Sequence, residues 1–482
     1  MKMIKYLVLR SINTQKVLFI CLTLTILLTN GYAEASNPLR VSADGRFILK
    51  PDGSPFTWIG DTGWGLFCES KSDVDYYLND RKNKGFTVIM AVALWISGND
   101  YKMRANTYGD YPVRNNNPAL PNDIYFAHVD YCVNKAESMG LYIAMLPTWG
   151  SWVNPEWSGT KIFNVSNARA YGEYLGNRYK NNKIIWVLGG DRNPGDINIW
   201  RAMAKGIAIG AIGVEDYSQI MITYHPRGGQ GYPKSSSSYY LHNETWLDFN
   251  MIQSGHSPNT TNYDWITQDY GKSPVKPVLD GEPRYEGIGV SPEIDDYDVR
   301  KSAYWSIFAG AAGHTYGGHE VWFFWNPGDH PSSTSHWNFD TAWKTALNFT
   351  GAHDMKHLKT LIESRPILKR IPDQSIVTSG TKSGDNRVQA ARASDGSYAF
   401  VYISSGDPVT VDLGKINSGD VETQWYDPRN GNYSAIGIYK ANSTRQFSPP
   451  SIGYGNDWIL VLDAYELTDT TPPAVPNNFR TR

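Results

Sequence analysis

The chain alternates short apolar segments with amphipathic ones, and this alternation most constrains its fold. Eight of the apolar segments are rich in β-branched or aromatic residues, which is typical of fully buried parallel strands. They cover residues 57–60, 87–93, 141–146, 184–188, 220–223, 249–252, 277–279 and 313–316. Eight strands that alternate with helices predict an α/β fold, a (β/α)8 TIM barrel.

Helical patterns separate most of these strands. We expect helices at residues 72–84, 125–139, 167–180, 197–209 and 299–309, and the last one or two helices within 343–363. Ser72 is the expected N-cap of the first helix, which ends before Gly85. The segment 42–56 alternates and contains two Asp-Gly turns, which predicts a β-hairpin before the barrel.

The first 35 residues are typical of a secretory signal peptide. Basic residues precede an apolar stretch, and a small-x-small sequence at 33–35 is suited to cleavage. The stretch is too short to favour a membrane-spanning helix, although an uncleaved anchor stays an alternative. Cys21 lies inside the stretch, which does not fit a lipoprotein signal. We expect a periplasmic or secreted protein without stable membrane insertion.

The character of the chain changes near Pro372. Short alternating strands between residues 388 and 462 are separated by turn clusters, which predicts a small antiparallel β-sandwich. We therefore expect four parts: a signal peptide at 1–35, a hairpin and catalytic barrel at 36–372, a sandwich at 373–465 and a linker-like tail at 466–482.

Charge and cysteine content limit the partners. A net charge of −2 and a pI near 6.6 argue against nucleic-acid binding. Cys68 and Cys132 are the only cysteines after position 35. Export permits a disulfide between them, but two cysteines do not make a disulfide framework. We expect a monomer.

Two predicted strands lead to a carboxylate, Asp191 and Glu282. Parallel barrels place their active sites at the carboxyl ends of the strands, so the two groups would face one cavity. Cleavage of a glycosidic bond needs one protonated and one ionised carboxyl group. Two glycines before Asp191 allow an unusual backbone conformation, and Arg284 could keep Glu282 anionic. We assign Asp191 as general acid/base and Glu282 as nucleophile.

Other interpretations of the carboxylates stay open. Asp191 or Glu282 could be an N-cap or a salt-bridge partner. Asp61, Asp280 and Glu320 also lie near strand ends. Asp61 could bind a sugar hydroxyl or brace the loops. Asp280 is an alternative nucleophile on the same face as Glu282, which we prefer because it lies closer to the rim.

Polar and aromatic residues collect at the predicted strand ends. The chain has 17 Trp and 31 Tyr, and aromatic rings on loops either stack on sugars or fill the core. The expected substrate-binding residues are Asp61, Trp64, Trp95, Trp149, His225, Gln253, His256, Arg284, Tyr316 and His319. We expect no metal and no cofactor, because no HExxH, calcium loop, Gly-x-Ser-x-Gly elbow or phosphate loop is present.

Several motifs in a fixed order identify a family resemblance. They are Trp58-Ile-Gly-Asp-Thr-Gly-Trp64, Trp186-Val-Leu-Gly-Gly-Asp191, Ile222-Thr-Tyr-His-Pro226, Met251-Ile-Gln-Ser-Gly-His256, Leu279-Asp-Gly-Glu-Pro283 and Gly313-His-Thr-Tyr-Gly317. Over residues 39–463 the chain resembles the apiosidase-like glycoside hydrolases of family 140. Its sandwich resembles a module labelled as collagen-binding. The resemblance implies a barrel with the acid/base at Asp191 and the nucleophile at Glu282.

The resemblance also implies a substrate, the apiose-containing side chains of the pectin rhamnogalacturonan II. The segment 99–120 is long and asparagine-rich, and it could change the glycan that is bound. A glycosidase for another plant-glycan linkage and a non-catalytic carbohydrate- or matrix-binding protein are the alternatives. The spacing of the two carboxyl groups would separate retention, at about 5–5.5 Å, from inversion, at about 6.5–9.5 Å.

Overall fold

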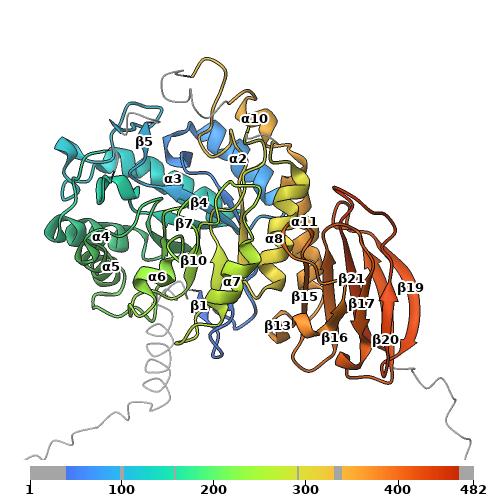
Figure 1. Cartoon of the computed structure of the whole chain (residues 1–482). Coiled ribbons are helices and arrows are strands. Elements are labelled where there is room, and N and C mark those ends of the chain that lie inside the picture. The colour runs from blue at the N-terminus through green and yellow to red at the C-terminus, as the bar shows by residue number, and fades with distance from the viewer. Residues whose placement is uncertain (1–38, 98–101, 157–158, 290–292, 330–338, 466–482) are drawn as a thin grey trace, which may run out of the picture. The chain divides into compact units, whose positions relative to one another are not determined.

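The computed structural model describes residues 39–97, 102–156, 159–289, 293–329 and 339–465 (Figure 1). The expected signal peptide and linker-like tail lie outside the described residues. Within these ranges, no helix combines the length and the apolar character needed to cross a membrane.

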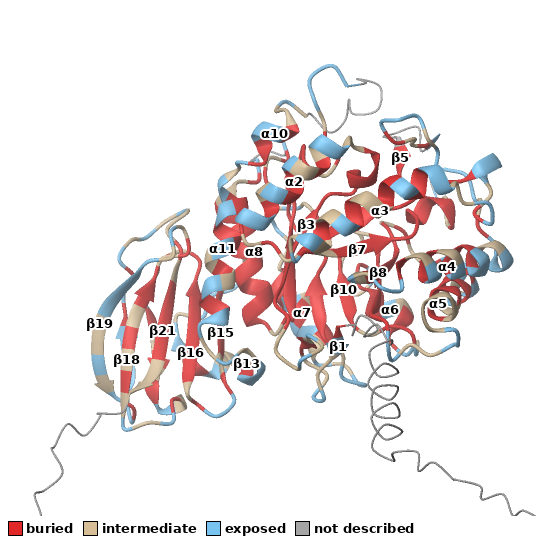
Figure 2. Cartoon of the chain, turned by 180° about the vertical axis from the view of Figure 1, so that it is seen from behind, coloured by how far each residue is buried: buried red, intermediate tan, exposed pale blue. Residues whose placement is uncertain are grey.

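Eight parallel strands form the central sheet, in the order β10-β11-β12-β3-β4-β7-β8-β9. They are β3 (Trp58–Thr62), β4 (Val88–Val92), β7 (Tyr142–Leu146), β8 (Ile184–Gly189), β9 (Ile222–His225), β10 (Asn250–Ile252), β11 (Val278–Asp280) and β12 (Gly313–Tyr316). The strands are buried on both faces (Figure 2), which explains their continuous apolar runs. The predicted TIM barrel is confirmed, and each predicted strand overlaps an observed one.

Between β9 and β10 the barrel closes through separate hydrogen bonds, two of them made by side chains, rather than through a strand ladder. The Thr223 hydroxyl donates to the Phe249 carbonyl at 2.7 Å. The Ile222 N–H donates to the Asp248 carboxylate at 2.6 Å, and the Asp248 N–H donates to the Ile222 carbonyl at 2.9 Å. These bonds satisfy backbone groups that a missing ladder would otherwise leave unpaired.

Helices follow most strands, and two of them were not predicted. The helices are α2 (Lys71–Asn83), α3 (Asp123–Ser138), α4 (Val165–Tyr179), α5 (Ile197–Ile212), α6 (Ser237–Leu241), α7 (Asn262–Tyr270), α8 (Asp296–Phe308), α10 (Trp343–Ala346) and α11 (Thr350–Glu363). The sequence analysis missed α6 and α7 because a helix of one or two turns shows little of the 3.6-residue period. The N-cap of α2 is Ser70, not Ser72, since its hydroxyl accepts the Asp73 N–H.

Short elements complete the barrel domain. A hairpin precedes the barrel, but its first strand, β1 (Arg40–Val41), lies before the predicted segment 42–56, and its second strand is β2 (Ile48–Leu49). A second hairpin, β5 (Ile96–Ser97) with β6 (Lys102–Met103), follows β4. The 3-10 helices of the whole chain include η1 (Leu66–Cys68), η3 (Arg114–Asn116), η4 (Gly150–Trp152), η5 (Ile367–Lys369), η6 (Gln374–Ile376), η7 (Gly384–Asn386) and η8 (Leu413–Lys415).

The C-terminal part consists of two antiparallel sheets, as predicted. The larger has the order β13-β15-β16-β21-β18-β19 and the smaller β14-β17-β20. Their strands are β13 (Arg370–Pro372), β14 (Val377–Ser379), β15 (Val388–Ala393), β16 (Tyr398–Ile403), β17 (Val409–Asp412), β18 (Asp420–Tyr426), β19 (Tyr433–Lys440), β20 (Thr444–Phe447) and β21 (Trp458–Tyr465).

The sandwich shares a hydrophobic core with α8 and α11 of the barrel. Tyr304 of α8 stacks on Tyr402 of β16, with ring centroids 5.1 Å apart. Next to this pair, the buried Arg300 binds Asp457 of the sandwich at 2.8 Å and Asp354 of α11 at 2.7 Å. An aromatic core around a paired buried charge makes the sandwich an integral part of the fold.

The two cysteines are not bridged. Cys68 and Cys132 are both buried free thiols. Burial raises the pKa of the Cys68 thiol to about 11, so it is neutral at ordinary pH and packs like a small apolar side chain.

Replacing Arg300 is expected to destabilise the protein strongly. In Arg300→Met the carboxylates of Asp457 and Asp354 lose their buried cation, a change that costs about 3–5 kcal/mol. Arg178→Met is the matched control, because Arg178 pairs with Asp130 at the partly exposed surface, where such pairs contribute about 0–1 kcal/mol. Thermal denaturation of both variants gives the comparison. Equal melting temperatures would contradict this account.

Candidate active site

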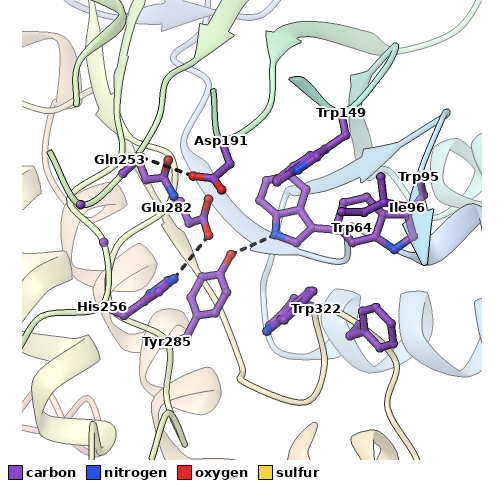
Figure 3. A pocket seen from close by; sticks show the side chains of 14 residues that line it. Trp64, Trp95, Ile96, Trp149, Asp191, Gln253, His256, Glu282, Tyr285 and Trp322 are labelled. Carbon is purple, nitrogen blue, oxygen red and sulfur yellow. Dashed lines mark hydrogen bonds and ion pairs between the residues drawn. The ribbon is translucent and has the colours of Figure 1, made fainter. Parts of the chain in front are cut away.

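A cavity of about 270 Å³ lies at the carboxyl ends of the barrel strands. It is lined by Trp64, Trp95, Ile96, Trp149, Asp191, Gly228, Gly229, Gln253, Gly255, His256, Glu282, Tyr285, Trp322 and Phe323 (Figure 3). The segment after each of the eight strands contributes at least one of these residues. The structure therefore brings together Asp191 and Glu282, which lie 91 positions apart in the sequence.

Asp191 enters the cavity through a left-handed turn. Its φ is 51°, and the preceding Gly189 and Gly190 have φ of 87° and 114°. A Cβ on Gly189 would lie 2.4 Å from the His225 carbonyl oxygen, and one on Gly190 would lie 2.8 Å from the Trp149 ring. Only glycine fits both positions. The Gly-Gly-Asp sequence thus turns the chain sharply at the end of β8, as the sequence analysis expected.

Glu282 lies between two histidines. Nε2 of His225 is 3.0 Å from Glu282 Oε2, although the ring N–H does not point directly at this oxygen. Nε2 of His256 is 3.5 Å from Oε1 (Figure 3). The sequence analysis placed both histidines at the site but named Arg284 as the group that keeps Glu282 ionised. The two imidazoles occupy that place.

The backbone orients both imidazole rings. The Asp191 N–H donates to Nδ1 of His225 at 3.3 Å, which leaves the His225 proton on Nε2, facing Glu282. Nδ1 of His256 lies 3.0 Å from the Pro283 carbonyl, to which it donates, so Nε2 donates to Glu282 when the ring is an imidazolium with a proton on both nitrogens. Both rings therefore turn Nε2 toward the carboxylate.

The two carboxyl groups have opposite pKa shifts. Burial and the nearby charge of Glu282 raise the pKa of Asp191. Burial also acts to raise the pKa of Glu282, but contacts with His225 and His256 outweigh it and lower the value. One group is therefore favoured as an acid and the other as an anion. This is the division of roles that two like charges in one cavity require.

Other groups limit the shift at Asp191. Its side chain is 33% exposed, and Arg192 Nη1 lies 3.3 Å from its Oδ2. The Gly228 N–H approaches Oδ1 at 3.5 Å. Arg192 and Gly228 favour the ionised form and oppose the effect of burial, so Asp191 can both donate and accept a proton.

An aromatic wall faces the carboxyl groups across the cavity. We use this name for Trp64, Trp95, Trp149 and Trp322 (Figure 3), together with Phe323, which also lines the cavity. The rings of Trp95 and Trp149 meet edge to face at 5.0 Å, and those of Trp64 and Trp149 at 5.5 Å. Such packing holds the rings rigidly, so apolar faces are available without further ordering. Flat apolar faces beside hydrogen-bonding groups suit a sugar ring.

The sequence analysis missed Tyr285 at this site. Its hydroxyl accepts the Trp64 indole N–H at 3.0 Å, and its ring lies 4.3 Å from that of His256 (Figure 3). Burial and the charge of Glu282 raise its pKa far above the ordinary value. Its position three residues after Glu282 is a sequence feature from which it could have been found. Ile96 of β5 and Gly228, Gly229, Gly255, Trp322 and Phe323 of the connecting segments were also not predicted, because apolar and glycine residues carry no catalytic pattern.

Five predicted substrate-binding residues lie outside the cavity lining, namely Asp61, His225, Arg284, Tyr316 and His319. The Asp61 carboxylate accepts the Tyr77 hydroxyl at 2.5 Å and Arg81 Nε at 2.7 Å. Asp61 therefore binds α2, whereas the alternative left open from the sequence was that it braces the loops. The Tyr316 hydroxyl donates to Glu286 at 2.6 Å, and the buried His319 packs against Phe339.

The structure does not place Arg284 where the sequence predicted it, next to Glu282. It is buried away from the cavity lining, and it donates to the carbonyl groups of Ser257, Pro258 and Thr260 and to the Ser302 hydroxyl. The prediction that Arg284 and Glu282 interact rested on their closeness in the sequence. The strand ends at Asp280, and beyond it the Arg284 side chain binds these other groups instead.

Asp280 is not at the cavity either. Its carboxylate accepts the Ser254 hydroxyl at 2.6 Å and the Asn262 amide at 3.1 Å. Burial raises its pKa to about 6. Asp280 and Glu320 do not line the cavity. Within the described ranges, no three His, Cys, Asp or Glu side chains gather as a metal-binding group.

Comparison with known proteins agrees with this geometry. Residues 42–369 match the family model "Apiosidase-like, catalytic domain". Residues 371–463 match "Putative collagen-binding domain of a collagenase". A search of curated proteins finds no match.

Two solved structures are similar over most of the chain. One, titled "Glycoside hydrolase", is 33% identical with a TM-score of 0.79, and the match covers 89% of this chain and 97% of that one. The other, a glycoside hydrolase family 5 protein from Bacteroides vulgatus, is 31% identical with a TM-score of 0.79, covering 89% of this chain and 94% of that one. The cavity, its carboxyl pair and these matches agree, and the chain belongs to the apiosidase-like family of glycoside hydrolases.

Proposed function

We propose that the protein is an exported, retaining glycoside hydrolase of family 140 that cleaves apiose-containing side chains of rhamnogalacturonan II-like pectin. The observation that carries the proposal is the carboxyl pair. Asp191 and Glu282 line one cavity, and their pKa values shift in opposite directions. The apiosidase-like family match supports the sugar, and the apolar N-terminal stretch supports export.

Asp191 and Glu282 have complementary roles in the proposed reaction. Asp191 donates its proton to the glycosidic oxygen as the bond to the anomeric carbon breaks. Glu282 attacks that carbon and forms a glycosyl ester. A water molecule then attacks the anomeric carbon, gives a proton to Asp191, and Glu282 leaves as a carboxylate. The ionised form of Glu282, favoured by His225 and His256, is the form that can attack.

Two groups in the cavity are suited to sugar hydroxyls. Within the described part of the chain, the Trp95 indole N–H and the Gln253 Oε1 atom have no hydrogen-bond partner. Leaving a buried polar group unpaired costs about 1–3 kcal/mol. Both atoms are buried in this structure, so a bound sugar would recover this cost when a small movement of the lining brings its hydroxyls within reach. One donor and one acceptor beside the aromatic wall support a polyhydroxylated, ring-shaped substrate.

Removing either carboxyl group is expected to abolish turnover. We expect Asp191→Ala to lower kcat/KM on rhamnogalacturonan II oligosaccharides by about 10²–10⁴-fold, the usual contribution of a general acid/base. Glu282→Ala should lose at least as much. Added azide should give a glycosyl azide of retained configuration with Asp191→Ala and of inverted configuration with Glu282→Ala. Product analysis by chromatography and NMR measures both.

The control is Asp264→Ala, since Asp264 is an exposed residue of α7. It should keep wild-type activity. If the wild-type protein cleaves another plant glycan instead, the proposed substrate is wrong but the proposed mechanism stands. A wild type that binds glycans but turns over none of a broad panel would favour the binding-protein alternative.

A bell-shaped pH dependence of kcat/KM follows from the two shifts. Activity is lost as the pH falls through the lowered pKa of Glu282, and as it rises through the raised pKa of Asp191. In His256→Asn the Glu282 carboxylate loses one stabilising contact, so the acidic limb should move to higher pH. Initial rates in buffers of constant ionic strength measure this. An unmoved acidic limb would exclude His256 from this role.

A further inference from the structure

Arg284 is a buried cation whose partners are mostly backbone carbonyls. It is 1% exposed. Its Nε donates to the Ser257 carbonyl at 3.2 Å, and its Nη2 donates to the carbonyls of Pro258 and, at 3.1 Å, Thr260. Nη1 donates to the Ser302 hydroxyl of α8 at 3.0 Å. Among the described residues, no carboxylate forms a salt bridge with it.

Burying a charge without a counter-charge is costly. Desolvation lowers the pKa of Arg284, and more distant carboxylates such as Asp298 partly offset this effect. Binding three backbone carbonyls does not by itself require a fully buried arginine. We therefore expect a functional residue in the loop that Arg284 binds.

The loop of residues 256–260 begins with His256, the residue beside Glu282. Ser257, whose carbonyl Arg284 holds, follows His256 directly in the chain. His256 itself makes only two polar contacts in the described part of the chain, with the Pro283 carbonyl at 3.0 Å and with Glu282 at 3.5 Å. Its position therefore depends on the backbone that carries it.

We propose that Arg284 is a positioning residue for the reaction. It ties the loop 256–260 to α8 and so keeps Nε2 of His256 against Glu282. This inference rests on the proposed function, because Glu282 is the group whose ionisation it affects. Helix α8, to which Arg284 connects the loop, is held firmly, since its residues Arg300 and Tyr304 pack against the sandwich.

The test compares Arg284→Gln and Arg284→Lys with the wild type. Arg284→Gln should lower kcat about 10²-fold, the effect of a displacement near 1 Å at a reacting centre, with little change in KM. Its acidic limb should move up by about one pH unit as His256 withdraws. Arg284→Lys keeps a donor toward the carbonyls and should recover part of both effects.

Arg370→Gln is the matched control. Arg370 is also buried, and it donates to the backbone carbonyl of Ala311 away from the cavity. Arg370→Gln should lower thermal stability without moving the acidic limb. If the acidic limb of the pH profile moves equally in Arg284→Gln and Arg370→Gln, the effect of Arg284 is merely structural and the inference is overturned.

A double-mutant cycle addresses the route through His256. If Arg284 acts by placing His256, adding His256→Asn to Arg284→Gln should move the acidic limb little further. Additive shifts would overturn the proposal. A double variant with the pH profile of His256→Asn alone would support it.

Hydrogen exchange gives a readout that does not need activity. In Arg284→Gln and in Arg284→Lys, amides of residues 254–262 should exchange faster, while those of the barrel strands should not change. Unchanged exchange in this segment would overturn the proposal even if no active substrate is found. Loss of activity in Asp191→Ala and Glu282→Ala, together with an unaltered Arg284→Gln profile, would leave the proposed function standing and remove only the role of Arg284.

Discussion

Two carboxyl groups of like charge in one cavity can work together only if their protonation states differ. In this protein the difference comes from the surroundings. Imidazole nitrogens approach both oxygens of Glu282, at 3.0 and 3.5 Å. Arg192 at 3.3 Å and the Gly228 N–H at 3.5 Å do not offset the effects that raise the pKa of Asp191. The histidines favour the anion at Glu282, and burial together with that anion raises the pKa of Asp191.

The fold supplies this asymmetry through its backbone. Gly189 and Gly190 take left-handed conformations that turn Asp191 inward, and the Asp191 N–H in turn fixes the ring of His225. One short segment thereby places the acid and orients a neighbour of the nucleophile. The shared core of α8, α11 and the sandwich supports the opposite side, which carries His256.

The strands and the carboxyl pair could be predicted from the sequence because they depend on local pattern. Buried parallel strands are continuously apolar, and the last residues of such strands share one rim. The partners of Asp61 and Arg284 could not be predicted from the sequence, since they depend on which neighbouring helix or loop lies within reach. Tyr285 was missed for the same reason, because only the fold brings Trp64 to its hydroxyl.

The central claim is that Glu282 attacks the sugar. The most direct measurement is mass spectrometry of the protein after reaction with an activated 2-deoxy-2-fluoro glycoside of the sugar that it releases. The account predicts one covalent sugar adduct, in the peptide that contains Glu282. An adduct on Asp191, or product of inverted configuration with no adduct, would contradict it.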